Sequence, residues 1–422
     1  MKTPLLNQKE IVVAPLVQDK TGEHYLVYAP FTGLFLEKSR EEVLRLEQVA
    51  RFTADKELQD TYARLTTRQR PLQQIQQIEE TTEMSILLNY ICNFSCSYCY
   101  SARGRSRKQI EKETLLTALD FFINRQRTRA PRLQLTFSGG GDPLASSSLL
   151  ETAITYASRR AGEQGFDIRY GMVTNGTLLT PEIIGLVTSY KINLVISFDV
   201  LEEVHNKQRE RYSDVCAGID ELISHQIYPG IRSTITPLNV DRMEEMVREM
   251  INRFPGLGGI AFEAVLNPSL FPTTEALKQF YTSFAENYFN ACRVGLEHDF
   301  YVGNTLVNNA GQCRERACLS KFTLTPEGAI TACSRISSPK EDFYDSFHYG
   351  TVTPDRQVQL DTDRLRHILS RNVYHYPECA SCIARWHCSG GCLLARHVYS
   401  PEEFAIHCGF VREMLIQTLK NK

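Results

Sequence analysis

Residues 84–100, MSILLNYICNFSCSYCY, begin a regular alternation of strand-like and helix-like patterns. The apolar run MSILLNYI is typical of a strand. Further strand patterns lie at 133–137, 166–174, 192–198, 231–236 and 259–265. Helical patterns follow at 108–127, 147–163, from Pro181 onward, 212–226, 240–253 and 274–292. Six βα units in a row predict an α/β fold, with a parallel sheet and crossover helices arranged as a partial (β/α)6 TIM-like barrel.

Residues capable of chemistry follow the first four predicted strands. CNFSCSYC follows the first strand, SGGGDP (138–143) the second and TNGT (174–177) the third, and Ser197 and Asp199 end the fourth. In parallel sheets of this kind, the active site lies at the carboxyl ends of the strands. We therefore expect these segments to meet in one site.

The segments on either side of the predicted barrel lack its regular alternation of strand and helix patterns. Residues 11–36 contain two β-rich runs, helical patterns continue to about residue 68, and a Gln-rich stretch leads into the barrel. The C-terminal part is rich in loops, with a hairpin pattern at 322–333 and a helix predicted at 409–420. We predict three domains, namely an α+β domain at 1–82, the barrel at 83–302 and a cysteine-rich domain at 303–422.

Composition narrows the class of protein. The 422 residues include 47 basic and 49 acidic side chains, and this balance argues against a general binder of nucleic acid or anionic membranes. No run approaches the length of a membrane span, and MKTPLLNQKE is too polar for a signal peptide. A cytoplasmic location is expected, where disulfides are rare, so the 13 cysteines indicate metal.

Three of these cysteines form a CxxxCxxC motif, Cys92, Cys96 and Cys99. Three thiolates on one loop can ligate three irons of a cubane cluster and leave the fourth iron open. A zinc site would need a fourth close ligand, and no Cys or His is near in the sequence. Cys216 and Cys292 stand alone in helical patterns and are interpreted as buried small hydrophobes. The basic run that begins at Arg103 and includes Arg105 is typical of a solvated face, with contact to a peptide as the alternative.

CNFSCSYCY resembles the signature of the radical S-adenosylmethionine (radical SAM) enzymes, and the later motifs resemble theirs in order and spacing. The resemblance implies a [4Fe–4S] cluster on Cys92, Cys96 and Cys99 that binds SAM. In SGGGDP, Asp142 stands where Glu is more usual, and the backbone of this turn would contact the methionine amino group. The SAM-binding residues implied are Tyr98, Ser138, Gly139, Gly140, Gly141, Asp142, Asn175, Ser197 and Arg209. Plain turns, a helix cap, aromatic packing and a solvated arginine are the alternative interpretations.

The C-terminal cysteines resemble the SPASM domain, which carries auxiliary clusters in many radical SAM enzymes that modify peptides. The resemblance implies two further [4Fe–4S] clusters, giving three in all. One would take Cys313, Cys318, Cys333 and Cys392, and the other Cys379, Cys382, Cys388 and Cys408. Two four-cysteine zinc ribbons are the alternative.

The resemblance implies reductive cleavage of SAM to a 5′-deoxyadenosyl radical, which abstracts a hydrogen from the substrate. The auxiliary clusters would accept an electron, and an external flavodoxin- or ferredoxin-type donor would supply one. Glu263 and Asp199 lie at predicted strand ends and are the candidates for a catalytic base, with a structural role as the alternative for each.

The N-terminal pattern resembles the leader-recognition domain of peptide maturases, which implies a precursor peptide with a leader as the partner. We predict a peptide maturase that installs a cross-link, either a thioether or a C–C or C–O bond. Sulfatase maturation is a second branch, disfavoured by Ser334 and by the long segment ahead of the barrel. Epimerisation and a non-catalytic, zinc-bearing interaction protein are the remaining alternatives.

Overall fold

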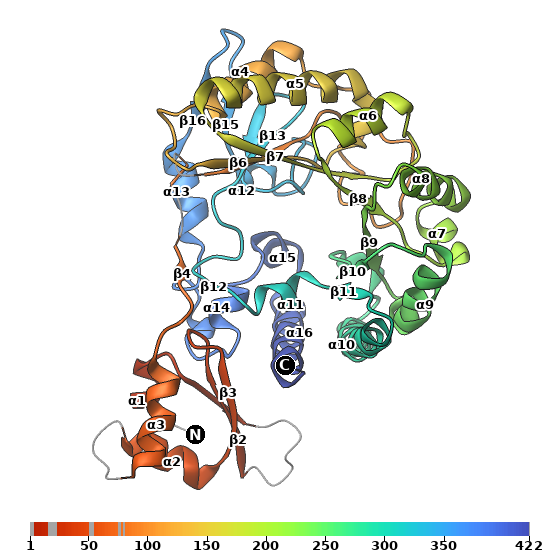
Figure 1. Ribbon diagram of the computed structural model, residues 1–422. Helices are drawn as coiled ribbons and strands as arrows, with labels where there is room; N and C mark the ends of the chain where they lie inside the picture. Colours follow the sequence, from red (N-terminus) through yellow and green to blue (C-terminus); the bar gives the residue numbers. More distant parts are fainter. Residues whose placement is uncertain (1–3, 16–22, 50–54, 75–76, 79–80, 422) are drawn as a thin grey trace. The chain divides into compact units, whose positions relative to one another are not determined.

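The computed structural model describes residues 4–15, 23–49, 55–74, 77–78 and 81–421 (Figure 1). They form two compact units. The barrel unit contains Gln76–Asn304 and Ser320–Leu369, and the terminal unit contains Met1–Ile75, Thr305–Leu319 and Ser370–Lys422. The units thus group parts of both ends of the chain together. The borders predicted at 82/83 and 302/303 stay a prediction.

The barrel unit is built on an open sheet of 11 strands, in the order β11-β10-β9-β8-β7-β6-β5-β13-β14-β15-β16. Neighbouring strands from β5 through β11 are parallel, which confirms the predicted α/β class. These strands are β5 (Glu83–Ile86), β6 (Arg132–Phe137), β7 (Asp167–Thr174), β8 (Asn193–Ser197), β9 (Gly230–Ile235), β10 (Gly259–Ala264) and β11 (Tyr301–Gly303).

Helices follow the outer side of the curved parallel sheet (Figure 1). They are α4 (Lys112–Phe122), α5 (Ser147–Gln164), α6 (Pro181–Ser189), α7 (Glu202–Gln208), α8 (Tyr212–Ser224), α9 (Met243–Arg253) and α10 (Thr274–Glu297). Local sequence sets their ends and faces. Thr180 caps α6 ahead of Pro181, as predicted, and α9 buries Met243, Met246 and Met250 on one face.

The loop-rich segment after the barrel supplies four more strands to the same sheet. They are β13 (Phe322–Leu324), β14 (Ala329–Thr331), β15 (His348–Val352) and β16 (Val358–Leu360). The hairpin β13–β14 is the one predicted, but β13 also pairs in parallel with β5, placing Phe322 opposite Met84. The pairing places Lys321, which directly precedes β13, near the amino end of the first barrel strand. Helices α12 (Tyr344–Phe347) and α13 (Thr362–Ser370) complete this region.

The terminal unit begins with an antiparallel sheet in the order β1-β2-β3, which matches the predicted β-rich runs. Its strands are β1 (Val12–Pro15), β2 (His24–Ala29), β3 (Leu34–Ser39) and the short parallel pair β4 (Leu72–Gln73) and β12 (Cys313–Arg314). Its helices are α1 (Pro4–Gln8), α2 (Arg40–Val49), α3 (Lys56–Thr66), α11 (Thr305–Asn309), α14 (Arg385–Cys388), α15 (Leu393–Val398) and α16 (Pro401–Lys420).

Side chains far apart in the sequence join this unit. The Tyr28 hydroxyl lies 2.7 Å from Nε2 of His387, and the Trp386 indole donates to Glu10 at 3.2 Å. Leu26 and Tyr28 also share a buried cluster with Val411 of α16.

Helix α16 begins at Pro401, so the predicted start at 409 is wrong. Ser400 and Glu403 form a reciprocal capping box, a local signal for this start that the apolar periodicity does not contain. As a result, Cys408 lies within the helix rather than in a loop before it. Among the described residues, no helix is both long and apolar enough to cross a membrane.

Candidate active site and a second cysteine cavity

A cavity of about 390 Å³ lies at the carboxyl ends of the barrel strands. All three cysteines of the CxxxCxxC motif line it. So do all nine residues predicted to bind SAM, namely Tyr98, Ser138, Gly139, Gly140, Gly141, Asp142, Asn175, Ser197 and Arg209. Segments that follow four different strands therefore meet in one place, as expected for a parallel sheet.

Hydrogen bonds fix the cysteine loop to its surroundings. Asn89 donates to the Asp142 carbonyl at 3.0 Å and to the Ser146 hydroxyl at 2.7 Å. On the other side, the Asn175 amide donates to Oδ1 of Asn93 at 2.9 Å. Burial raises the pKa of the Cys96 thiol to about 11, so this thiol stays neutral until a metal or cationic group offsets the desolvation.

Arg105 also contacts this loop, contrary to the expectation of a solvated face. Its guanidinium donates to the Phe94 carbonyl, and Nη2 lies 3.4 Å from Sγ of Cys99. The basic run gave no local signal that one of its members turns inward.

The glycine turn brings its backbone against the first strand's loop. A Cβ added at Gly141 would collide with the Ile91 carbonyl, and Gly140 has φ +70° with the Asn89 carbonyl close by. The Asp142 side chain is buried. It accepts hydrogen bonds from the Thr174 hydroxyl at 2.9 Å and from the backbone N–H of Asn175 at 2.8 Å. This carboxylate therefore ties the turn to the end of β7, while the turn's backbone lines the cavity.

A buried polar chain supports the opposite wall. Arg209 donates to the Tyr98 hydroxyl at 2.7 Å, and that hydroxyl donates to Oδ2 of Asp199 at 2.7 Å. Asp199 has no exposed surface, accepts further bonds from Ser233 and Thr234, and does not line the cavity. Burial raises its pKa, and its contacts are those of a positioning residue. Glu263, the other candidate base, does line the cavity.

Arg209 keeps one unused donor. Its side chain lines the cavity, and its Nε is buried without a hydrogen-bond partner among the described residues. A buried, unpaired guanidinium N–H is costly, so this atom indicates a missing acceptor. A bound anionic group would supply one.

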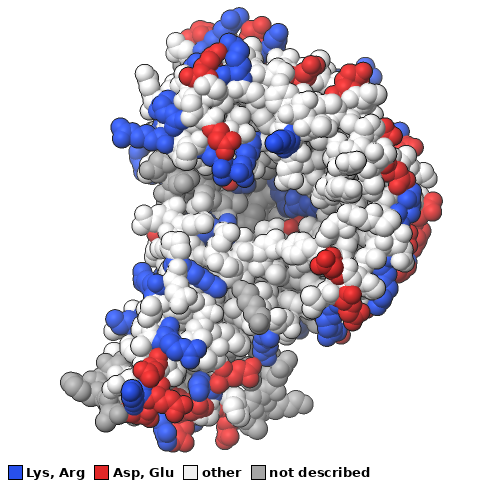
Figure 2. All heavy atoms as spheres, viewed as in Figure 1, with Lys and Arg blue, Asp and Glu red and all other residues white. Residues whose placement is uncertain are grey.

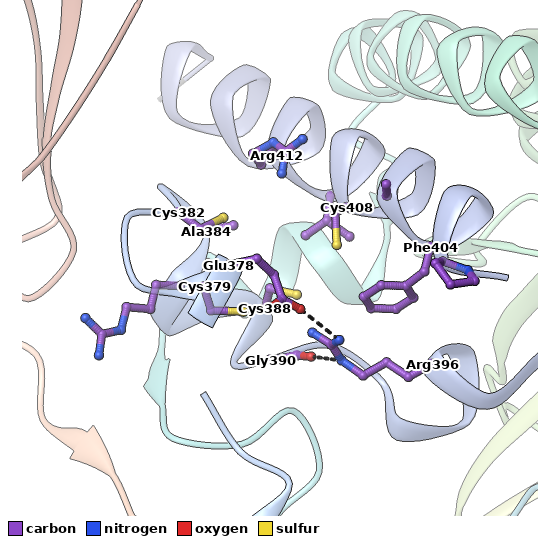
Figure 3. A pocket seen from close by; sticks show the side chains of 14 residues that line it. Glu378, Cys379, Cys382, Ala384, Cys388, Gly390, Arg396, Phe404, Cys408 and Arg412 are labelled. Carbon is purple, nitrogen blue, oxygen red and sulfur yellow. Dashed lines mark hydrogen bonds and ion pairs between the residues drawn. The ribbon is translucent and has the colours of Figure 1, made fainter. Parts of the chain in front are cut away.

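A second cavity, of about 260 Å³, lies in the terminal unit and is lined by Cys379, Cys382, Cys388 and Cys408 (Figure 3). Figure 3 shows these thiols around one space, with Arg396 and Phe404 at its side. Arg396 donates to the Gly390 carbonyl at 2.7 Å and to Glu378 at 3.0 Å.

The thiols of the second cavity are not arranged around a single ion. Among the described residues, no three His, Cys, Asp or Glu side chains converge closely enough to hold one metal ion. Four thiols around a cavity of this size fit a larger group better than a zinc ion.

The other four C-terminal cysteines are divided between the units. Cys313, Cys318 and Cys392 belong to the terminal unit, and Cys333 belongs to the barrel unit. Their assignment to one cluster stays a prediction. Of the two single cysteines, Cys216 is buried in α8 and Cys292 is half-buried in α10.

Comparison with known families identifies the barrel. Residues 86–252 match the model of the radical SAM superfamily. These residues form a radical SAM domain. A radical SAM domain implies an enzyme with iron–sulfur chemistry that uses one [4Fe–4S] cluster and SAM.

Relatives of the radical SAM domain extend the comparison. The radical SAM cyclopropyl synthase TigE of Paramaledivibacter caminithermalis is 21% identical over 346 residues, which cover 77% of this chain and 70% of TigE. Matches to the other curated relatives span only 30–55% of those proteins' own length.

Two solved structures share the fold at low identity. The structure of anSMEcpe with bound AdoMet and Kp18Cys peptide has a TM-score of 0.62 and 16% identity, and the match covers 81% of this chain and all of that one. SuiB of Streptococcus suis, bound to its precursor peptide SuiA, has a TM-score of 0.52 and 11% identity, with 94% and 97% covered. Both place this chain in the partial-barrel fold.

Proposed function

We propose that this protein is a radical SAM peptide maturase that installs a cross-link in a precursor peptide. The observation that carries the proposal is the single cavity shared by the three motif cysteines and the nine residues predicted to bind SAM. Their common location supports a working cofactor site, because isolated turns and solvated side chains would have no reason to converge.

The residues of this cavity fit the implied cofactors. Cys92, Cys96 and Cys99 would hold three irons of the cluster, and the unpaired Nε of Arg209 would receive the SAM carboxylate. Ser197 would contact the ribose, and the backbone of the 138–142 turn the amino group. The bound cofactors supply a radical that can abstract a hydrogen from an unactivated C–H bond.

The chain's own residues orient these groups. Asp199 holds the Tyr98 hydroxyl, which in turn holds Arg209, so a carboxylate outside the cavity fixes the guanidinium that lines it. A direct hydrogen bond from the Asn175 side chain to Asn93 holds the cysteine loop in place. Such fixed donors lose little freedom on binding, and an enclosed cavity keeps water from a reactive intermediate.

The two auxiliary clusters are part of the proposal. The cavity lined by Cys379, Cys382, Cys388 and Cys408 supports one of them, and Cys313, Cys318, Cys333 and Cys392 would hold the other. Four protein ligands leave no open iron, so electron transfer suits such a cluster. A cross-link formed from a substrate radical releases one proton and one electron. These clusters would accept the electron and carry it away from the substrate, and an external flavodoxin- or ferredoxin-type donor would supply the electron that cleaves SAM.

A peptide substrate is supported by two of the comparisons. anSMEcpe and SuiB have both been solved with a bound peptide, and the SuiB match extends over nearly the whole chain. The sheet of the terminal unit offers a place for a leader, because β3 pairs only with β2 among the described strands. An extended leader would add a strand at that edge.

The proposal is tested by anaerobic incubation of the reduced, reconstituted protein with SAM and the small peptide encoded beside its gene. A cross-link appears in the mass spectrum as the loss of two hydrogens. An unchanged mass with altered stereochemistry would indicate epimerisation, and conversion of a Ser or Cys to formylglycine would indicate the sulfatase-maturing reaction. Zinc in place of iron in the purified protein would contradict all three.

Leader binding has its own measurement. Amides of β3, Leu34–Ser39, should gain protection from hydrogen exchange when the peptide is added. Protection confined to the barrel unit would contradict a leader site on this sheet.

A further inference from the structure

The wall of the barrel cavity carries more positive than negative charge. Five basic side chains line it, Arg105, Arg209, Arg232, Lys321 and Arg335. Only two acidic side chains do, Asp142 and Glu263. Asp142 is 4% exposed and its oxygens already accept bonds from Thr174 and Asn175, so it offers little charge to a molecule in the cavity.

Two of the basic groups have roles beside the proposed cofactor. Arg209 contacts Tyr98 and keeps its free Nε for the SAM carboxylate. Arg105 donates to the Phe94 carbonyl and contacts Sγ of Cys99, so its charge faces the cysteine loop. The remaining basic side chains that line the cavity are those of Arg232, Lys321 and Arg335.

Arg232 and Lys321 reach the cavity from different parts of the sheet. Arg232, on β9, has a side chain that is 42% exposed, and its Nη2 lies 3.9 Å from Oε1 of Glu263. One long ion pair leaves the rest of its planar guanidinium able to bind a second carboxylate. Lys321 directly precedes β13 and forms no ion pair among the described residues.

Tyr100 also lines the cavity, beside one of these basic side chains. Its ring is 45% exposed, and the guanidinium carbon of Arg335 lies 5.4 Å from the ring centre. An aromatic surface beside basic groups suits a side chain that has an apolar stem and a carboxylate head.

Building on the proposed function, we propose that Arg232 and Lys321 bind a carboxylate of the peptide substrate. Attraction between opposite charges is stronger in a partly enclosed cavity than in bulk water, and a guanidinium bound to a carboxylate also fixes its orientation. The carboxylate belongs either to an acidic side chain near the modified residue or to the C-terminus of the peptide. Both have the same chemistry.

The test uses the anaerobically reconstituted full chain with SAM and a mixture of acetylated, amidated pentapeptides Gly-Ala-X-Ala-Gly, where X is Glu, Gln or Lys. Peptides retained on ultrafiltration are quantified by mass spectrometry. Retention of the Glu peptide should exceed that of the Gln peptide roughly tenfold. A Gln peptide with a free C-terminus is an isomer of the Glu peptide and is tested in a separate incubation; stronger retention than that of the Glu peptide would assign the carboxylate to the C-terminus, and weaker retention would assign it to the acidic side chain. Equal retention of all peptides, including none, would overturn the inference.

Charge reversal keeps the test independent of folding. The Lys321→Glu variant should retain the Lys peptide more strongly than the Glu peptide, and a misfolded protein cannot gain such a preference. The Arg232→Met variant should lose the preference for the Glu peptide. Arg248→Glu, at an exposed position on α9, is the matched control and should keep the wild-type preference. An unchanged preference in Lys321→Glu would overturn the inference.

The wild-type preparation separates this inference from the proposed function. If reductive SAM cleavage occurs without any carboxylate preference, only the inference fails. If no cleavage occurs, the proposed function itself fails.

Discussion

The two cysteine cavities of this protein have different surroundings. The barrel cavity has three thiols, a glycine turn and many polar side chains drawn from separate strands. The cavity of the terminal unit has four thiols, and apolar groups such as Pro401, Phe404 and Val411 complete much of its wall. The first combines its thiols with a glycine turn that can bind a ligand through its backbone, whereas the second surrounds its four thiols with apolar groups and the arginines Arg385, Arg396 and Arg412.

This difference indicates different chemistry. A cluster with three protein ligands keeps one iron for a cofactor, so its cavity must also bind that cofactor's polar groups. A cluster with four protein ligands needs only to be enclosed and held. In the second cavity it would join the 377–388 segment to α16, and so would support the fold of a unit with short elements.

The largest effect is expected when the cysteines of the barrel cavity are removed and those of the second cavity are kept. Replacing Cys92, Cys96 and Cys99 together by Ala should lower the iron content from about 12 to about 8 per chain and abolish reductive SAM cleavage. Iron analysis and chromatography of the cleavage products measure both effects. Cys292→Ala, at a half-buried helical position, should change neither value. SAM cleavage by the triple variant would refute the assigned site.

The converse change is Cys388→Ala in the second cavity. It should remove about 4 irons per chain and leave the electron paramagnetic resonance signal of the barrel cluster responsive to SAM. The melting temperature should also fall, because the lost cluster no longer joins α14 to α16. Loss of the SAM-responsive signal would show that the two cavities are not independent.

A smaller effect is expected from Asp199→Asn in the barrel. Its buried carboxylate balances the buried Arg209 guanidinium through Tyr98, so the change should lower the free energy of unfolding by about 3 kcal/mol. Urea denaturation measures this change. The control is Asp167→Asn, which breaks an exposed ion pair with Arg132 and should cost less than about 1 kcal/mol. Equal losses in the two variants would contradict the role of the buried chain.

The smallest effect concerns the helix that carries Cys408. Ser400→Ala removes half of the capping box of α16 and should cost about 1 kcal/mol of unfolding free energy. Ser400→Thr keeps the hydroxyl and should stay close to the wild type. If the alanine variant matches the threonine variant in urea denaturation, the cap does not stabilise this helix.

Local patterns in the sequence predicted the barrel and the motifs that line its cavity. Alternating strand and helix signals fixed six βα units, and Thr180 with Pro181 marked a helix start. Because parallel strands bring their carboxyl ends to one edge, motifs separated by many residues could be assigned to one site before any contact was known. The cysteine spacing indicated metal for a different reason, because ligands on one loop stay close together in any fold.

Tertiary structure decided what no local pattern contains. The pairing of β13 with β5 brings Lys321 to the cavity, and the inward turn of Arg105 is set by the Phe94 carbonyl. Asp199 lies two residues after the end of β8, where packing buries it and the Tyr98 hydroxyl donates a hydrogen bond to it. Strand partners and side-chain directions depend on segments far along the chain. The sequence therefore predicted which motifs meet, and the fold decided which further side chains line the cavity.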